Sequence, residues 1–244
     1  MTPYEQKQHA KRRYAAARKL EAEYLRGLRK ITRHIDGMVR DLAENPTQLQ
    51  AMLWRYGEIL QPWAQALSER IVYGIAKKDA DAWTQLGADI GRNIRAEIQS
   101  APTGQMFRKF MAENVSLITS LPQEAAQRVH RLVAQGMVEG RRAEDITRDI
   151  LQTGPVTESR ARLIARTEVA RAASGLTMAR AEYVGSTHYI WRTSDDSDVR
   201  ESHKKMNGKV VAWADPPTLS DGTTTHAGMI YNCRCYPEPI LPKI

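Results

Sequence analysis

The 244-residue sequence predicts a mostly α-helical protein that ends in a small α+β unit. Up to about residue 184, apolar side chains recur at steps of three and four, which is typical of helices that bury one face. After residue 187 the apolar pattern alternates with a period of two, and turn-forming residues become frequent. We therefore expect a bundle of long helices, followed by short strands packed on a helix.

A domain boundary is expected near residue 110. Residues 1–110 would form a helical N-terminal region, made of one long helix and a bundle. Residues 111–244 would form a second domain, with helices over 113–184 and a small sheet over 187–239.

Residues 4–43 predict one long helix, because they contain no Pro and only two Gly residues. Such a helix would be roughly 60 Å long at 1.5 Å per residue. Asn45–Pro46 ends it. Its apolar stripe is expected to pack on other helices and consists of Tyr24, Leu28, Ile31, Ile35, Met38 and Leu42.

Two further helices are expected in the N-terminal region, over 46–73 and 77–99, with Pro62 bending or dividing the first. Their apolar stripes should lie in the core. These stripes are Met52, Tyr56, Ile59, Trp63 and Leu67, then Trp83, Leu86, Ile90, Ile94 and Ile98.

The second half predicts shorter elements. Helices are expected over 103–117, 122–137, 143–152 and 158–184, the last capped by Thr157. Strands are expected over 189–193, 209–213 and 231–236, with a helical turn over 199–205.

The net charge of +8 favours a polyanionic partner such as non-specifically bound double-stranded DNA. The basic first half of the long helix supplies the candidate contacts, and a solvated helical face is the alternative. These candidates are Lys11, Arg12, Arg13, Arg18 and Lys19. The chain has neither a secretory signal nor an apolar run of membrane-spanning length, so we expect cytoplasmic synthesis and no membrane partner.

Glu168 falls on a stripe of small residues within the predicted helix over 158–184. A carboxylate on a packing face needs a cationic or hydrogen-bonding partner. We interpret Glu168 as a buried organiser that pairs with Arg166 or Arg171, and a catalytic glutamate is the alternative.

Cys233 and Cys235 project to the same face if they lie in a strand, so that both sulfurs could bind one ion. His203 would be a third ligand, and His226 or an aspartate a fourth. We expect any such metal to be a structural zinc ion, because the C-terminal α+β unit is too small to be stabilised by its core alone and needs a crosslink. The alternative is two small buried cysteines and a hydrogen-bonded core histidine.

The chain is not expected to be an enzyme, since it has no nucleophile elbow, phosphate-binding loop or dinucleotide fingerprint. Metal-dependent phosphodiester hydrolysis by His203 with the nearby aspartates and cysteines is the catalytic alternative.

From the segment that contains Glu168 to the cysteine pair, the sequence resembles the phage head morphogenesis domain, the Mu F-like minor head protein family. The likeness covers roughly 113–239 and runs through ENVSLITSLP (113–122), Gly140, Gly154 and ARLIARTE (161–168) to Asn232-Cys233-Arg234-Cys235 with Pro237. The chain departs from the family where a Pro or His–Pro often precedes the Asn-Cys-Arg-Cys run, because here His226 is followed by Ala-Gly-Met-Ile-Tyr. The signature positions are Arg166, Thr167, Glu168, Trp191, Asp195, Arg200, His203, Gly208, Asn232 and Arg234.

The resemblance implies a minor capsid protein of a tailed bacteriophage that acts in procapsid assembly. Its implied partners are the portal protein, other capsid and scaffold components, and packaged DNA. It would be located in the virion head near the portal, with the N-terminal region as an arm that faces the portal or DNA.

Overall fold

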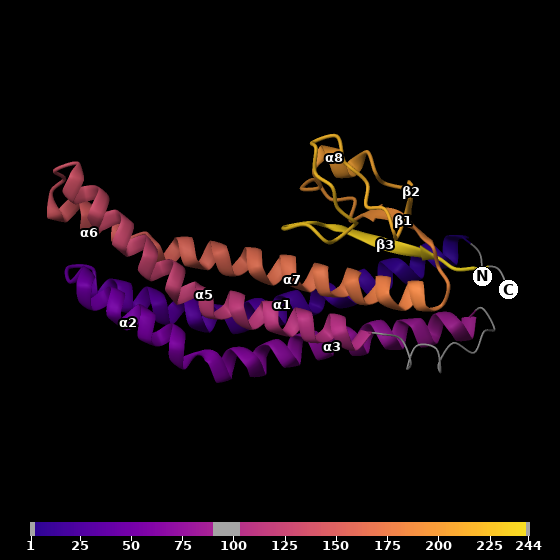
Figure 1. Cartoon of the computed structure of the whole chain (residues 1–244), viewed down its shortest axis with the longest axis horizontal. Coiled ribbons are helices and arrows are strands. Elements are labelled where there is room, and N and C mark those ends of the chain that lie inside the picture. The colour runs from indigo at the N-terminus through magenta and orange to yellow at the C-terminus, as the bar shows by residue number, and fades with distance from the viewer. Residues whose placement is uncertain (1–2, 90–102, 243–244) are drawn as a thin grey trace. The chain divides into compact units, whose positions relative to one another are not determined.

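The computed structural model describes residues 3–89 and 103–242, and it confirms the predicted fold class. The helices are α1 (Pro3–Leu42), α2 (Pro46–Ile59), α3 (Gln61–Asp89), α5 (Thr103–Val138), α6 (Ala143–Leu151), α7 (Thr153–Tyr183) and α8 (Glu201–Lys204) (Figure 1). The strands are β1 (His188–Thr193), β2 (Val210–Ala212) and β3 (Cys235–Ile240).

The chain divides into two compact units. The first, here called the sheet unit, comprises Met1–Glu21, Arg70–Phe110 and Arg166–Ile244. The second, the helical unit, comprises Ala22–Glu69 and Met111–Ala165. These units do not coincide with the boundary expected near residue 110, because α1, α3, α5 and α7 each contribute a part to both.

The predicted long helix is confirmed as α1, and most of its apolar stripe is buried as predicted. In the helical unit, Gly27 of α1 allows close packing, since a Cβ there would lie 2.9 Å from Leu67 Cδ2. Arg29 and Thr32 of α1 bond to the carboxylate of Glu158 on α7, at 2.9 and 3.0 Å.

The division near Pro62 is also confirmed, since α2 ends at Ile59 and α3 begins at Gln61. Asn45 caps α2 by accepting a hydrogen bond from the Gln48 N–H, and Pro46 occupies the first turn. The predicted stripe on this helix was partly wrong, because Met52 and Ile59 are exposed. The buried face instead consists of Leu49, Leu53 and Gly57.

Three helix boundaries differ from the prediction. No break separates 73 from 77, so α3 runs on to Asp89, and Ile90, Ile94 and Ile98 lie outside the described residues. Pro122 lies within the continuous helix α5, where the lost backbone bond is tolerated. Thr157 is not a cap, since α7 already begins at Thr153 and the Thr157 hydroxyl donates to the Thr153 carbonyl at 2.8 Å.

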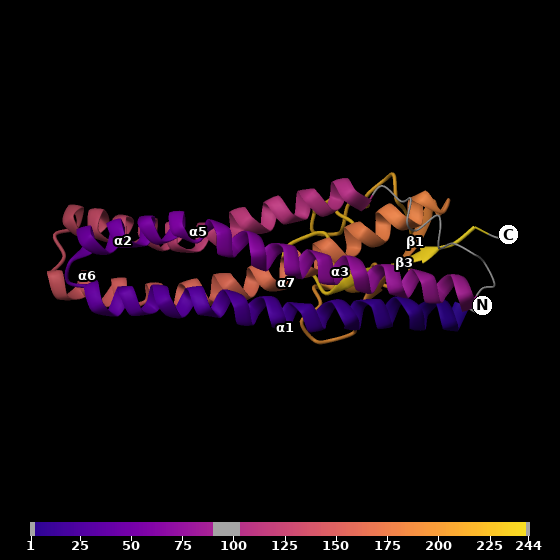
Figure 2. The same ribbon diagram turned by 90° about the horizontal axis from the view of Figure 1, so that it is seen from below.

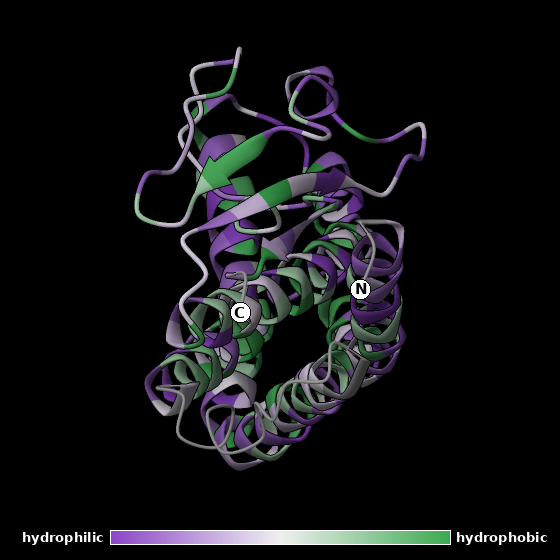
Figure 3. Cartoon of the chain, turned by 90° about the vertical axis from the view of Figure 1, so that its right-hand side faces the viewer, coloured by the Kyte–Doolittle hydropathy of each residue, from purple (hydrophilic) through white to green (hydrophobic). Residues whose placement is uncertain are grey.

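The three strands form an antiparallel sheet in the order β2-β1-β3. They lie over the C-terminal part of α7 in both side views (Figures 1 and 2). Trp83 and Leu86 of α3, Ala181 of α7, and Tyr189 and Trp191 of β1 share one apolar core in the sheet unit. Viewed from the end and coloured by hydropathy, the strands contain hydrophobic residues (Figure 3).

The predicted last strand was misplaced. Residues 231–234 form a turn, and β3 runs over Cys235–Ile240 although it contains Pro237 and Pro239. Both prolines are tolerated because β3 is an edge strand and their nitrogens, two residues apart, point away from β1.

Candidate functional site

The turn before β3 carries the most distinctive residues of the chain, Asn232-Cys233-Arg234-Cys235. Asn232 has a left-handed backbone conformation, with φ of 53°. Asparagine tolerates this conformation better than most residues other than glycine. The turn can therefore reverse direction sharply and place both cysteines in the interior.

Two consecutive residues of α7 hold this turn. The Asn232 N–H donates to Oγ1 of Thr167 at 3.0 Å, and the Arg166 guanidinium donates to Oδ1 of Asn232 at 3.1 Å. Arg166 also pairs with Glu21 of α1 at 3.4 Å. The conspicuous Arg-Thr pair of the helix thus serves as an anchor for the turn.

Glu168, the next residue on α7, is buried and pairs with Arg171 at 3.0 Å. The predicted packing of its small-residue stripe is visible at Gly175, where a Cβ would lie 2.7 Å from Met106 Cε and 2.8 Å from Phe110 Cζ. This geometry fits the predicted organising role of Glu168.

Arg234 extends inward between two aspartates of the β1–α8 loop. Its guanidinium lies 2.8 Å from Asp196 and 2.6 Å from Asp198, and its carbonyl accepts from the Ser194 N–H at 2.9 Å. Partial burial opposes ionisation of Asp196, but hydrogen bonds from Arg234 and Ser194 outweigh it and lower the pKa of that carboxyl. The loop and the turn are therefore tied together by charge.

The two cysteines meet His203 of α8 in the core. Nδ1 of His203 lies 3.3 Å from Sγ of Cys235 and 3.5 Å from Sγ of Cys233. All three side chains are buried, and their candidate ligand atoms lie within 4.8 Å of one another. The structure thus brings together the three residues that the sequence pattern predicted as ligands.

The electrostatics of the cysteine pair are asymmetric. The hydrogen bond from Cys235, together with the contact to His203, lowers the pKa of Cys233 despite its burial. The same pairing and burial raise the pKa of Cys235. The contacts of the pair therefore favour the thiolate form at Cys233 over Cys235.

Neither His226 nor the predicted aspartates join this cluster among the described residues. Asp195 accepts from Thr193 at 2.7 Å, and Asp198 pairs with Arg234. His226 lies against Tyr189, whose hydroxyl is 3.1 Å from its Nδ1.

The remaining signature residues shape the same region. The Trp191 ring meets that of His203 edge to face, with centroids 5.5 Å apart. Arg200 donates to the Tyr231 carbonyl at 3.1 Å, beside the turn. Gly208 has φ of +83°, and its N–H bonds to the Trp191 carbonyl, which aligns β2 with β1.

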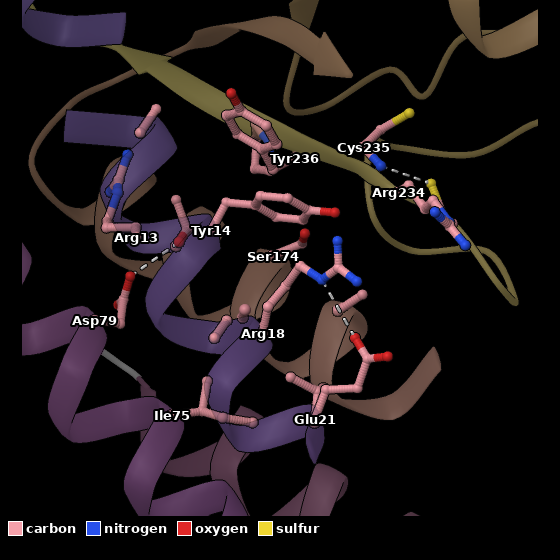
Figure 4. A pocket seen from close by; sticks show the side chains of 18 of the residues that line it. Arg13, Tyr14, Arg18, Glu21, Ile75, Asp79, Ser174, Arg234, Cys235 and Tyr236 are labelled. Carbon is pink, nitrogen blue, oxygen red and sulfur yellow. Dashed lines mark hydrogen bonds and ion pairs between the residues drawn. The ribbon is translucent and has the colours of Figure 1, made fainter. Parts of the chain in front are cut away.

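A partly open pocket lies in the sheet unit between α1, α3, α7 and β3 (Figure 4). Tyr14 and Tyr236 stack in its wall, with centroids 4.7 Å apart. Cationic and anionic side chains line it, namely Arg13, Arg18, Lys78, Arg166, Arg234, Glu21 and Asp79.

The candidate DNA-contacting residues separate into two groups. Lys11, Arg12, Arg18 and Lys19 are exposed. Arg13 instead lies over the Trp83 ring, 5.3 Å from its centroid, and burial lowers its pKa. Arg13 is therefore partly buried against Trp83, unlike the other four candidates.

Sequence reasoning missed a buried polar pair. Asp79 of α3 accepts hydrogen bonds from Thr177 and Arg180 of α7, and all three side chains are buried. Asp79 and Arg180 lie on otherwise apolar faces of α3 and α7. A charged residue on such a face needs a buried partner, so this pattern could have indicated the pair.

These features define the class of protein: a helical scaffold with a small sheet, in which the most distinctive polar residues hold backbone segments in place. Residues 127–237 match the family of Phage Mu protein F like proteins, so the chain carries a domain of that family and the predicted resemblance is confirmed.

The chain is also 34% identical over 169 residues to an uncharacterized protein of Haemophilus influenzae. The match covers 69% of this chain but only 37% of that relative. No solved structure gives a significant match. Among the residues that the structure describes, no helix is both long and apolar enough to cross a membrane.

Proposed function

We propose that this chain is a minor capsid protein that acts in the morphogenesis of a tailed-phage head. The family match over residues 127–237 carries the proposal. The arrangement of the matched residues supports it, because Arg166, Thr167, Asn232 and Arg234 are engaged with one another or with loop residues. Residues used in this way maintain a shape, which suits a component of an assembly.

The proposal places the protein in the virion head, at the portal and in contact with packaged DNA. The exposed positions Lys11, Arg12, Arg18 and Lys19 support the DNA contact. Lys11 and Arg18 are seven residues apart, as are Arg12 and Lys19, so all four lie on one side of α1. A basic stripe of this kind binds phosphates without selecting a sequence.

Phosphodiester hydrolysis receives less support. In the part of the chain that the structure describes, the aspartates are bound to Arg234, Thr193 and Asn207 and do not join His203. The buried donors are one imidazole and two thiols, a soft set that differs from the carboxylate-rich sites of metal-dependent nucleases.

Isolation of heads from the phage that encodes the chain tests the proposal. Full-length protein carrying a tag should co-purify with procapsids and with the portal protein, and deletion of the gene should reduce the yield of filled heads. Failure of the protein to appear in procapsids and mature heads isolated at low salt would contradict the proposal.

A further inference from the structure

We propose that His203, Cys233 and Cys235 bind a zinc ion that fastens α8 to the beginning of β3. This inference rests on the geometry of the cluster and is independent of the proposed role in the phage head. It assigns the three residues as ligands of one metal site.

The distances from the imidazole nitrogen of His203 to the two sulfurs fit a tetrahedral zinc ion. With Zn–S of about 2.3 Å and Zn–N of about 2.0 Å, the N···S edge of a tetrahedron is about 3.5 Å. The observed Nδ1–Sγ distances are 3.3 and 3.5 Å, and the three ligand atoms all lie within 4.8 Å of one another. The side chains are thus already arranged around a position that an ion would fill.

A metal-free core does not account for His203 equally well. Its side chain is 2% exposed, and Nε2 has no hydrogen-bond partner among the described residues. Nδ1 instead faces the two sulfurs, which are weak hydrogen-bonding groups. A buried histidine is normally held by an oxygen atom, whereas a soft cation satisfies an imidazole and two thiolates together.

Charge and position also favour zinc. Two thiolates, a neutral imidazole and Zn²⁺ sum to zero, so the occupied site costs little to bury. The ligands are 30 and 32 residues apart in sequence, across a long irregular segment. A metal bridge over such a loop stabilises the folded state in the way that a crosslink does.

Metal analysis of the full-length chain tests the site. Protein purified under reducing conditions without chelator should contain one zinc ion per chain. After removal of the metal, Co²⁺ alone should produce the thiolate charge-transfer and tetrahedral d–d absorption bands, and added Zn²⁺ should abolish both. Zinc should also raise the melting temperature of the apoprotein in a concentration-dependent way.

Cys233→Ser and Cys235→Ser should each lose the cobalt charge-transfer intensity and the response of the melting temperature to zinc. His188→Ala is the matched control, because His188 lies in the same unit but is exposed on β1. The wild-type measurement decides the question even if the cysteine variants fail to fold. Wild-type apoprotein that binds neither Zn²⁺ nor Co²⁺, or a folded Cys233→Ser/Cys235→Ser double variant that binds zinc as tightly as wild type, would overturn the proposal.

Discussion

The backbone N–H of Asn232 donates to the hydroxyl of Thr167 at 3.0 Å, although the two residues are 65 positions apart. This bond joins the middle of α7 to the left-handed turn from which both cysteines enter the core. The Arg166 contact with the Asn232 side chain reinforces it. The register between helix and turn therefore depends on two adjacent side chains of α7.

Replacement of Thr167 by valine should lower the free energy of unfolding by about 1 kcal/mol, because the shape is kept while the acceptor is lost. Chemical denaturation of the full-length chain measures the change. Thr167→Ser keeps the hydroxyl and should stay closer to wild type. Equal stability of the valine and serine variants would show that the hydrogen bond contributes nothing.

Removal of Asp79 should be costlier. Asp79 pairs with Arg180, and its negative charge offsets part of the lowering of the Arg13 pKa by burial, so Asp79→Ala leaves both cations without this compensation. We expect a loss of about 3–5 kcal/mol. Arg180→Met should cost less, because Asp79 still accepts the hydrogen bond from Thr177 and is still attracted by the positive charge of Arg13. The order of the two denaturation midpoints checks this, and the reverse order would contradict it.

Gly228 should tolerate no side chain. Its φ is +80°, and a Cβ there would lie 3.0 Å from the Cys235 carbonyl oxygen and would meet the Ser174 hydroxyl. Gly222 has nearly the same φ of +81°, with nothing within 4 Å of an added Cβ. Gly222→Ala should therefore cost only the backbone strain of about 1–2 kcal/mol, and Gly228→Ala more. Thermal unfolding of the two variants compares them, and equal melting temperatures would refute the close approach.

His226 should make stability depend on pH. Burial lowers its pKa below 6.5, although the Trp213 carbonyl and Asp215 oppose this. The folded state thus favours the neutral ring, and its contribution is present above pH 6.5 and lost as the pH falls through the lowered pKa. His226→Gln should flatten the fall in unfolding free energy as the pH drops below 6.5. Exposed His188→Gln is the control, and an unchanged slope in His226→Gln would contradict the argument.

The exposed face of α1 should control the salt dependence of DNA binding. Changing Lys11, Arg12, Arg18 and Lys19 together to glutamine should reduce the slope of log K against log salt by about 3–4, at roughly 0.9 per phosphate contact. Changing Arg148, Lys204, Lys205 and Lys209 to glutamine alters the net charge equally on other exposed elements and should leave most of the slope. Fluorescence titration with duplex DNA measures both, and equal slopes would assign the effect to net charge alone.

Much of the helical architecture could be predicted because apolar periodicity reports burial directly. Tyr24, Leu28, Ile31 and Ile35 follow this rule, and all four are buried. Prolines misled the prediction, because two of them were expected at the boundary of an element and lie inside one. Pro122 continues a helix and Pro237 continues a strand, because tertiary context decides whether the lost N–H was needed.

Local sequence could not reveal which charges lie inside. Arg13 has the same basic neighbours as Arg12, but only Arg13 faces Trp83, which is 70 residues away. The Cys233, Cys235 and His203 cluster was predictable as a set because few side chains other than cysteine and histidine combine softness with burial. Its anchors on α7 follow only from the path of the chain, since Thr167 and Asn232 carry no signal that they meet.

The alternating prolines of β3 have a consequence for the sheet as a surface. Pro237 and Pro239 remove the amide protons that the outer side of this edge would otherwise offer to another strand. A strand from a second copy of the chain, or from another peptide, would lack these hydrogen-bond donors if it paired with the edge at β3. At a high local concentration of protein, the sheet is thus protected from edge-to-edge association at β3.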